Sequence, residues 1–483
     1  MWDPARWGLP LEAILRLGDN LLEFWTHFRH CFWTQTRDQS PKAYHYLSGL
    51  LRMTKKRTFA EIGRTTGQPG ENIQHFMTNS PWSARAVYNQ VQADIAATPE
   101  LRTGGMLLLD ESADAKAGTK TAGAGRQRNG RLGKVDLCQV GVFLSFVKDS
   151  TWTWVDGELF LQEHWFEPKM EDERKRLGIP SDRTFKTKVE LGWEMIQRAQ
   201  SNGLPFEAVG CDDLYGRANW FRAEMAGAGL IYMADVPCDT QVYLACPEFG
   251  VPETPPGHKG RKYTVPRVFS DDKPKTVYQV AGLPDTHWQR IRVRPTERGE
   301  LVAEFAVRRV WTMRDEKPTE EWLTIRRDAD GDHRYALSNA HPEMQAEDLA
   351  WMHGQRYFVE RSIQDAKSEM GWDEFQAQKF QAWEHHLALT ILASWFVAQT
   401  KLRWAQQYPR DPKLYQELEV DLLPALSVAN VRELLRAVMP LPQLSREQAA
   451  EHVVKHLVNR TRSRKSRLKK KSPRPNHRAR DPA

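Results

Sequence analysis

A chain of 483 residues is too long for one hydrophobic core, and its 40% hydrophobic content predicts that most of it folds into several domains. The five cysteines have no CxxC spacing, the N-terminus lacks an apolar signal segment, and Leu387–Ala398 is too short to cross a bilayer, so we expect no zinc site, no secretion and no membrane span. The formal net charge of +7 is concentrated in residues 460–483, where eleven Lys or Arg stand against one acid and leave the rest of the chain at −3.

Residues 1–100 are predicted to form a helical DNA-binding domain, because their apolar residues have helical spacing and residues 58–77 have the spacing of a helix-turn-helix. Gly63 is small where two helices would cross, and Gly67 permits the turn. Ile73 and Phe76 would face the core, which leaves Gln74 on the outer face, where an amide can pair with adenine. An ordinary helical hairpin has the same spacing, and the pattern leaves both interpretations open.

Residues 101–236 alternate apolar runs with helices, as expected of an α/β domain. Met106–Leu109 is an apolar strand that stops at Asp110, and Phe206–Gly210 is a strand that leads to Asp212. Further strands are predicted at Leu137–Val147, Thr151–Leu161 and Leu230–Val236, and helices at Lys186–Gln200 and Ala218–Ala226. Three strands, a helix and then strand-helix-strand describe the first part of an RNase-H-like core. Ala113–Lys134, rich in glycine and cations, is predicted to be a mobile loop without regular structure.

The rest of the chain interrupts this pattern and then resumes it. Residues 237–345 alternate in the manner of antiparallel strands and predict a β-rich insertion with arginines on one face, which a solvated surface would also explain. Residues 346–410 are predicted to be the second, helical part of the core, and residues 411–459 a smaller C-terminal helical region. Residues 460–483 are predicted to be a basic disordered tail, whose charge suits a polyanion but also simple solubility.

Three acids are candidates for metal binding: Asp110 and Asp212 at strand ends, and Glu360 in a later helix. Mg²⁺ prefers hard oxygen ligands, and two such ions can activate the attacking oxygen and stabilise the leaving oxygen of a phosphoryl transfer. A strand-end Asp is equally explained as a cap of the following turn. Glu111 and Asp213 stand beside the two aspartates and are alternative ligands.

The sequence around these acids resembles the DDE transposases of bacterial insertion sequences, most of all the insertion sequence seven-oh-one family, which is related to the insertion-sequence-four type. Asp212 stands three residues before a Tyr-Gly pair, and Arg356, Glu360 and Lys367 have the spacing of the family's third-acid helix. His353 stands where the related pattern has a tyrosine. The other matching segments are Leu107-Leu-Leu-Asp-Glu-Ser112, Gly125-Arg-Gln127, Gly133-Lys-Val135 and Cys138-Gln-Val-Gly-Val142, within a similarity that covers about residues 44–397.

The resemblance implies a transposase that binds the terminal inverted repeats of its own element, cuts DNA at the element ends and joins the freed 3′ end to target DNA. Its catalytic acids would be Asp110, Asp212 and Glu360, holding two Mg²⁺ ions, with Mn²⁺ as a substitute. The residues expected to contact double-stranded DNA are Arg356, Lys367, Lys134 and Gln74. The resemblance also implies a homodimer or larger assembly on DNA and a cytoplasmic, nucleoid-associated place in a bacterium.

Two other functions fit the same residues. A transposase-derived protein that binds DNA without cutting it would not need the three acids, whereas a metal-dependent nuclease without strand transfer would. Trp322 or Trp351 could stack on a base extruded near the cut, although packing in the core is the favoured role for either.

Overall fold

The computed structural model describes residues 2–257, 259–269, 272–296, 299–314, 317–328, 330–441 and 445–471. Residues 1–440 form one compact unit, and residues 441–483 form a second. The domain boundaries predicted after residues 100, 236, 345 and 410 therefore fall inside the first unit. Across the described ranges, no helix combines the length and the apolar character needed to cross a membrane.

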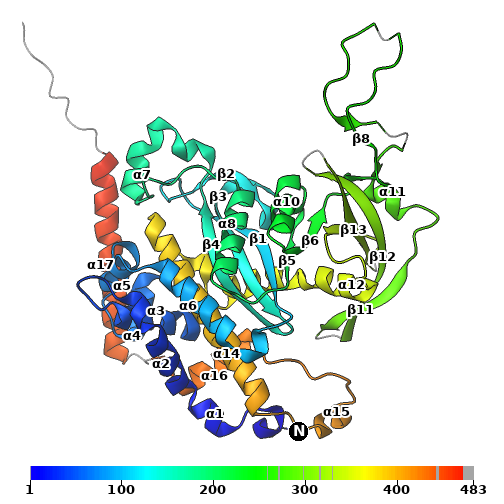
Figure 1. The fold of residues 1–483 in the computed structure, drawn as a ribbon. Helices are drawn as coiled ribbons and strands as arrows, with labels where there is room; N and C mark the ends of the chain where they lie inside the picture. The colour runs from blue at the N-terminus through cyan, green and yellow to red at the C-terminus, as the bar shows by residue number, and fades with distance from the viewer. Residues whose placement is uncertain are drawn as a thin grey trace, which may run out of the picture. The chain divides into compact units, whose positions relative to one another are not determined.

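A ten-stranded sheet runs through the first unit, with helices packed against it (Figure 1). The strand order is β11-β12-β13-β14-β6-β5-β1-β3-β2, and β4 pairs with β3. Strand β5 is parallel to both β1 and β6, and the other pairs are antiparallel. The predicted α/β class is therefore confirmed. The bounds are β1 Met106–Ala115, β2 Gly125–Asn129, β3 Lys134–Lys148, β4 Thr151–Phe160, β5 Ala208–Cys211, β6 Ile231–Val236, β11 Gln289–Thr296, β12 Gly299–Arg314, β13 Lys317–Arg327 and β14 His333–Ser338.

Side chains alternate between the two faces of the sheet along each strand, and apolar side chains on both faces are covered by helices. Leu107 and Leu109 of β1 join the larger core cluster together with residues of α8 and α10, whereas Met106 and Leu108 join a second cluster with residues of α12 and α13. The predicted helical stretch after residue 346 is thus two helices, joined at Arg356. The bounds are α7 Glu171–Leu177, α8 Lys188–Ser201, α9 Asp213–Gly216, α10 Asn219–Gly227, α12 Ala346–Gln355 and α13 Tyr357–Ser368.

The predicted N-terminal helices share the core of the sheet. Tyr46 of α3 hydrogen-bonds to Nδ1 of His386 at 2.9 Å, and Trp82 stacks on His385 with ring centroids 3.7 Å apart. Both histidines belong to the long helix α14, which also packs on β4. The first hundred residues therefore fold against the rest of the unit. The bounds are α1 Leu11–Leu15, α2 Leu17–Phe28, α3 Ser40–Arg52, α4 Phe59–Thr66, α5 Gly70–Thr78, α6 Ala84–Ala97 and α14 Phe380–Gln407.

Helices α4 and α5 form the pair predicted at residues 58–77. Gly67 ends α4 at a φ of 70°, and a Cβ on Gly63 would lie 2.5 Å from a carbonyl oxygen of the connecting turn. Gly63 is therefore required by the close approach of the turn, and Gly67 is favoured by its left-handed backbone conformation. Ile73 and Phe76 are buried and Gln74 is exposed, as predicted.

Residues 237–345 add the antiparallel strands β11 to β14 to the central sheet. Strand β14 pairs with β6, and β11 forms the outer edge. In β11, Ile291 and Val293 are buried while Arg290 and Arg292 are exposed, so these two arginines share one face. The consecutive Arg326 and Arg327 of β13 point to opposite faces, so the arginines of residues 237–345 are not confined to one face as predicted. Figure 1 shows the segment with β8 reaching away from the sheet. The smaller elements are β7 Gln241–Val242, β8 Phe249–Gly250, β9 Arg267–Val268, β10 Lys275–Thr276 and α11 Val277–Ala281.

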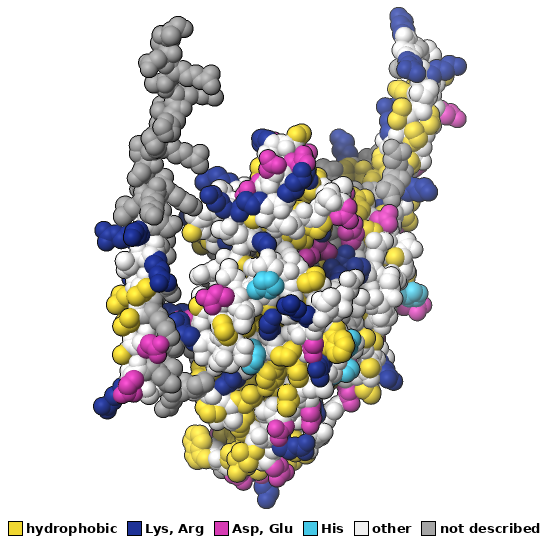
Figure 2. Space-filling model, turned by 90° about the vertical axis from the view of Figure 1, so that its left-hand side faces the viewer, with side chains coloured by type: hydrophobic (Ala, Val, Ile, Leu, Met, Phe, Trp, Pro, Cys, Tyr) yellow, Lys and Arg dark blue, Asp and Glu magenta, His cyan; other side chains and the backbone are white. Residues whose placement is uncertain are grey.

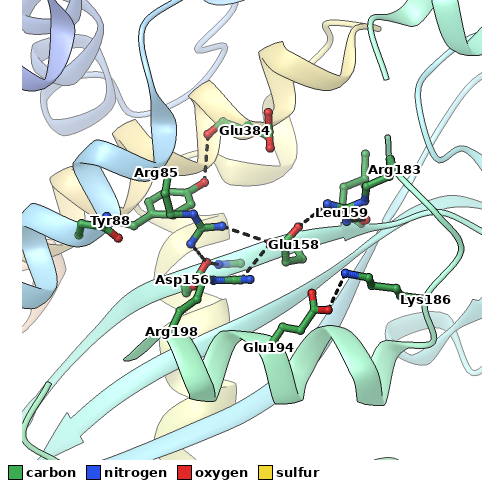
Figure 3. A network of polar contacts seen from close by, with 12 residues as sticks. Arg85, Tyr88, Asp156, Glu158, Leu159, Arg183, Lys186, Glu194, Arg198 and Glu384 are labelled. Atoms are coloured by element: carbon green, nitrogen blue, oxygen red, sulfur yellow. Dashed lines mark hydrogen bonds and ion pairs between the residues drawn. The ribbon is translucent and has the colours of Figure 1, made fainter. Parts of the chain in front are cut away.

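A network of ion pairs ties three helices to β4 (Figure 3). Asp156, whose side chain is fully buried, accepts hydrogen bonds from Arg85 of α6 at 2.7 Å and from Arg198 of α8 at 2.9 Å. Glu158 accepts from the same two arginines and from Arg183 at 3.0 Å. Five charged side chains thus neutralise one another where α6 and α8 meet the strand. The third helix, α14, joins through Tyr88 of α6, which donates to the carbonyl oxygen of residue 384 at 3.2 Å.

Two segments differ from the sequence predictions. The mobile loop predicted at residues 113–134 is wrong at both ends, since β1 continues to Ala115 and Gly125–Asn129 forms β2. The long strand β3 offers backbone partners to both, which outweighs the local glycine content. Residues 460–471, predicted to belong to a disordered tail, are the last part of α17, and residues 472–483 lie outside the described residues. The remaining bounds are α15 Lys413–Glu417, α16 Val428–Val438 and α17 Arg446–Lys471.

Candidate active site

Asp110 and Asp212 lie side by side where the parallel pairing of β1 with β5 ends. The prediction that the first strand stops at Asp110 is wrong, because β1 continues to Ala115 in antiparallel pairing with β3. Leu109 of β1 pairs with Cys211 of β5, and in each strand the next residue is the acid. Alternation along the strands places both carboxylates on the sheet face that α12 and α13 cover. Asp212 also caps α9 by accepting a backbone N–H at 3.0 Å, so the capping interpretation holds for one of its oxygens.

The two carboxyl groups have perturbed acidities. The pKa of Asp110 is raised to about 8, chiefly by burial and next by the charge of Asp212, with Arg356 opposing both effects. Burial likewise raises the pKa of Asp212 to about 6, with the charge of Glu111 acting in the same direction and Arg356 against it. Two acids that resist ionisation in this way lack compensating positive charge, which a bound cation would supply.

The neighbouring acids are engaged elsewhere. Glu111 follows Asp110 and so points to the opposite face, where it forms an ion pair with Lys188 at 2.6 Å and accepts a hydrogen bond from Tyr215 at 3.1 Å. Asp213 is half exposed and pairs with Arg217 at 2.8 Å. Of each adjacent pair, only Asp110 and Asp212 therefore lie on the α13 side of the sheet.

Asp235 continues the row of strand-end acids and was missed by the sequence analysis. Cys211 of β5 pairs with Ala234 of β6, which places Asp235 beside Asp212 as Asp212 stands beside Asp110. Its carboxylate binds Arg356 at 2.7 Å and lies 3.5 Å from Nε2 of His353. The signal was present in the sequence, because Asp235 comes near the end of the predicted strand Leu230–Val236.

Arg356 connects this row to Glu360. Burial alone would lower the pKa of the guanidinium, but Asp235, and after it Asp110, Asp212 and Glu360, raise it above its ordinary value. Glu360 is exposed in the first turn of α13. Within the described part of the chain, no three His, Cys, Asp or Glu side chains are gathered closely enough to hold a metal ion. The aspartate pair fits a hard cation, and the third predicted ligand does not join it in this arrangement.

Lys367, predicted to contact DNA, forms an ion pair with Asp114 inside the fold. Its ammonium binds the Asp114 carboxylate at 3.0 Å and donates to the carbonyl oxygen of Ala113 at 3.0 Å. The Lys367 side chain is only 11% exposed. It therefore fastens α13 to the end of β1.

The other predicted DNA contacts lie apart from the acids in the sequence and in the fold. Lys134 is exposed at the start of β3, beside the β2–β3 turn. Gln74 borders a groove of about 720 Å³ whose lining includes the cations Arg176 and Lys379. Over the face shown in Figure 2, Lys and Arg side chains are interspersed with Asp and Glu. Trp322 and Trp351 both pack against the cluster beneath α12 and α13.

Comparison with known proteins identifies the superfamily to which the chain belongs. A family model described as DDE superfamily endonuclease matches residues 27–300, more than half of the chain. The chain therefore belongs to the DDE superfamily endonucleases. The matched segment includes Asp110 and Asp212 and ends before Glu360.

A curated relative narrows the class to the transposases of one kind of insertion sequence. The chain is 24% identical over 351 residues to a probable transposase for insertion sequence element IS701 from Microchaete diplosiphon, an alignment that covers 70% of this chain and 77% of the relative. The resemblance found in the motifs is therefore confirmed. Enzymes of the matched superfamily act with divalent metal ions.

Proposed function

We propose that this protein is a transposase that binds the terminal inverted repeats of its own element, cuts DNA there and transfers the cut strand to target DNA. The observation that carries the proposal is the pair Asp110 and Asp212, only partly compensated by Arg356 and adjacent where the parallel pairing of β1 with β5 ends. The strand order β4-β3-β1-β5-β6 supports an RNase-H-like core, with β11 to β14 as its insertion.

Asp110 and Asp212 would hold divalent metal ions, Mg²⁺ or Mn²⁺, and Glu360 would be the third ligand. Such ions, when bound, activate the attacking oxygen and stabilise the leaving oxygen. Since Arg356 interacts with all three acids, its guanidinium would partly offset their charge when the ions are absent and turn to a DNA phosphate when they are present. The pairing of Lys367 with Asp114 supports a role in positioning α13 against β1.

Double-stranded DNA is the proposed substrate, bound as element ends and as target by a homodimer or a larger assembly. The exposed Lys134 and Gln74 are the proposed contacts away from the acids, Lys134 to phosphate and Gln74 to a base edge. The pairing of α4 and α5 through Gly63 supports the helix-turn-helix interpretation.

The test uses purified protein, Mg²⁺ and DNA that carries the inverted repeats flanking the gene. Asp110→Asn, Asp212→Asn and Glu360→Gln should each lower cleavage by more than about a hundredfold while end binding persists, because binding rests on DNA contacts and chemistry on the acids. Asp213→Asn is the matched control and should cut like the wild type. Cleavage above a few per cent in one of the three variants would remove that residue from the site.

Strand transfer is assayed separately, with pre-cut ends and a circular target. Joined products would distinguish a transposase from a nuclease that only cuts. Cleavage without any joining would leave the metal site standing and refute the transposase proposal.

A further inference from the structure

A pocket of about 200 Å³ lies between the strands of residues 237–345 and the junction of α12 and α13. Four arginines from separate elements line it: Arg294 of β11, Arg326 of β13, Arg334 of β14 and Arg356. Glu360 of α13 also borders the pocket. The cavity is therefore next to the candidate active site but is built largely by strands outside the core.

The register of the sheet places this pocket next to the row of acids formed by Asp110, Asp212 and Asp235 on neighbouring strands. Asp235 pairs with Ala336 of β14, and Arg334 lies two residues earlier on the same face. Arg326 is directly opposite Arg334 in the β13–β14 ladder. With strands about 4.8 Å apart, the pocket begins roughly 5 to 10 Å from Asp212, a distance of one to three nucleotide steps.

Positive charge exceeds negative charge in the lining, where four guanidinium groups meet the carboxylates of Asp235 and Glu360. Asp328, outside the pocket, is shared by Arg326 at 2.5 Å and Arg334 at 3.3 Å. One carboxylate thus serves two cations that both face the cavity. An anion in the pocket would be attracted by this excess.

Buried donors in the lining point to a ligand that accepts hydrogen bonds. His353 is 4% exposed, and neither ring nitrogen has a hydrogen-bond partner. The Nε–H groups of Arg326 and Arg356 are likewise buried without an acceptor. Leaving such donors unpaired is costly, and the oxygens of a tetrahedral anion could accept from the two guanidinium groups and from the one protonated ring nitrogen of His353.

We propose that this pocket binds one backbone phosphate of the DNA strand lying at the acid row, with Arg326 and Arg334 as its positioning residues. At about 30 Å³ per water molecule, the cavity has the room of about seven waters, which suits one phosphate with its sugar rather than a base pair. The inference rests on the proposed function for the identity of the strand. Residues 237–345 would then fix the position of the scissile bond as well as extend the sheet.

The experiment asks whether the loss of binding caused by one uncharged phosphate analogue in the DNA depends on a pocket arginine. End DNA is made with a methylphosphonate at each of the three positions on either side of the cut, and binding is measured without metal. In the wild type, one of these substitutions should weaken binding about tenfold. In Arg326→Gln and in Arg334→Gln the same substitution should weaken binding clearly less than in the wild type, because one of the guanidinium groups that the phosphate faces is already absent.

Arg327→Gln is the matched control, because Arg327 neighbours Arg326 but faces away and pairs with Glu304 at 2.8 Å. It should keep the full methylphosphonate penalty. The Arg334 side chain is 53% exposed, so its variant is expected to fold, and its melting temperature checks this. If Arg326→Gln and Arg334→Gln keep the wild-type penalty at every position, the pocket does not bind backbone phosphate.

Two further measurements separate this inference from the proposed function. If the wild type cuts element ends but shows no coupling, the pocket assignment fails and the transposase proposal stands. Binding of inorganic phosphate to wild type but not to Arg334→Gln, without coupling on DNA, would indicate a free-anion site and overturn the DNA assignment. Coupling on DNA together with an inactive wild type would support the pocket and count against the proposed chemistry.

Discussion

Two groups of acids on one sheet differ in what surrounds them. Asp156 and Glu158 on β4 are each bonded to two or more arginines and hold α6 and α8 in place (Figure 3). Asp110 and Asp212 on β1 and β5 have the partial attraction of Arg356, whose ion pair goes to Asp235. The protein therefore compensates acids that support the fold and leaves uncompensated those that would receive a cation.

Breaking the compensated group should have the largest effect on stability. Asp156→Asn removes a fully buried charge from Arg85 and Arg198, and we expect the free energy of unfolding to fall by about 3 kcal/mol. Denaturant titration measures this. The control is Glu194→Gln, since the Lys186–Glu194 pair drawn beside the network is 36% exposed on each side and should contribute under about 1 kcal/mol. Equal losses in the two variants would contradict the comparison.

Neutralising an uncompensated acid should instead raise the free energy of unfolding. The pKa of Asp110 is raised to about 8 in the folded protein, so its contribution to stability is complete at pH below about 4 and is lost as pH rises through 8. Asp110→Asn removes that loss and should be more stable than wild type by about 1 kcal/mol or more at pH 8 with chelator present, but not at pH 4.

Added Mg²⁺ gives a second test of the prediction for Asp110. It should stabilise the wild type increasingly between pH 6 and pH 8, because binding requires both aspartates to be ionised, and should leave Asp110→Asn unchanged. Thermal melts with and without Mg²⁺ measure this. A variant that is less stable than wild type at both pH values would show that Asp110 supports the fold.

The smallest effect is expected at Glu384, which lies beside the compensated group. Burial raises the pKa of Glu384 to about 7, with the charge of Glu158 adding to it and Arg183 and Arg85 opposing. Its contribution to stability is therefore lost as pH rises through 7. Glu384→Gln should flatten the decline between pH 6 and pH 8 by about 0.5–1 kcal/mol relative to wild type, measured by denaturant titration at each pH. An identical pH dependence would place Glu384 outside the network.

The sequence predicted most elements of this fold because their patterns are local. The apolar run before Asp110, the helical spacing around Ile73 and the alternation at Arg290 each needed only neighbouring residues. Strand β2 was missed because it lies in a glycine-rich, basic segment, and only pairing with β3 makes its residues extended.

The candidate site was less accessible to sequence reasoning. Asp110 and Asp212 were found because each follows an apolar run, and the same signal would have found Asp235. The partners of Arg356 and Lys367 could not be predicted, because Asp235 and Asp114 are brought to them by sheet register and by the break between α12 and α13. Roles of this kind depend on contacts between residues more than a hundred positions apart.

The hydrogen bonding of β14 to β6 also protects the chain from aggregation. Ile231–Val236 is a largely buried apolar strand, and without β14 its backbone groups would form an open edge able to pair with another molecule. The outer edge is instead β11, which carries the exposed Arg290 and Arg292 and an irregularity after Arg292. Charge and distorted pairing both discourage strand addition there. Trimming residues 237–345 to make a minimal core would therefore expose the strand that this chain keeps covered.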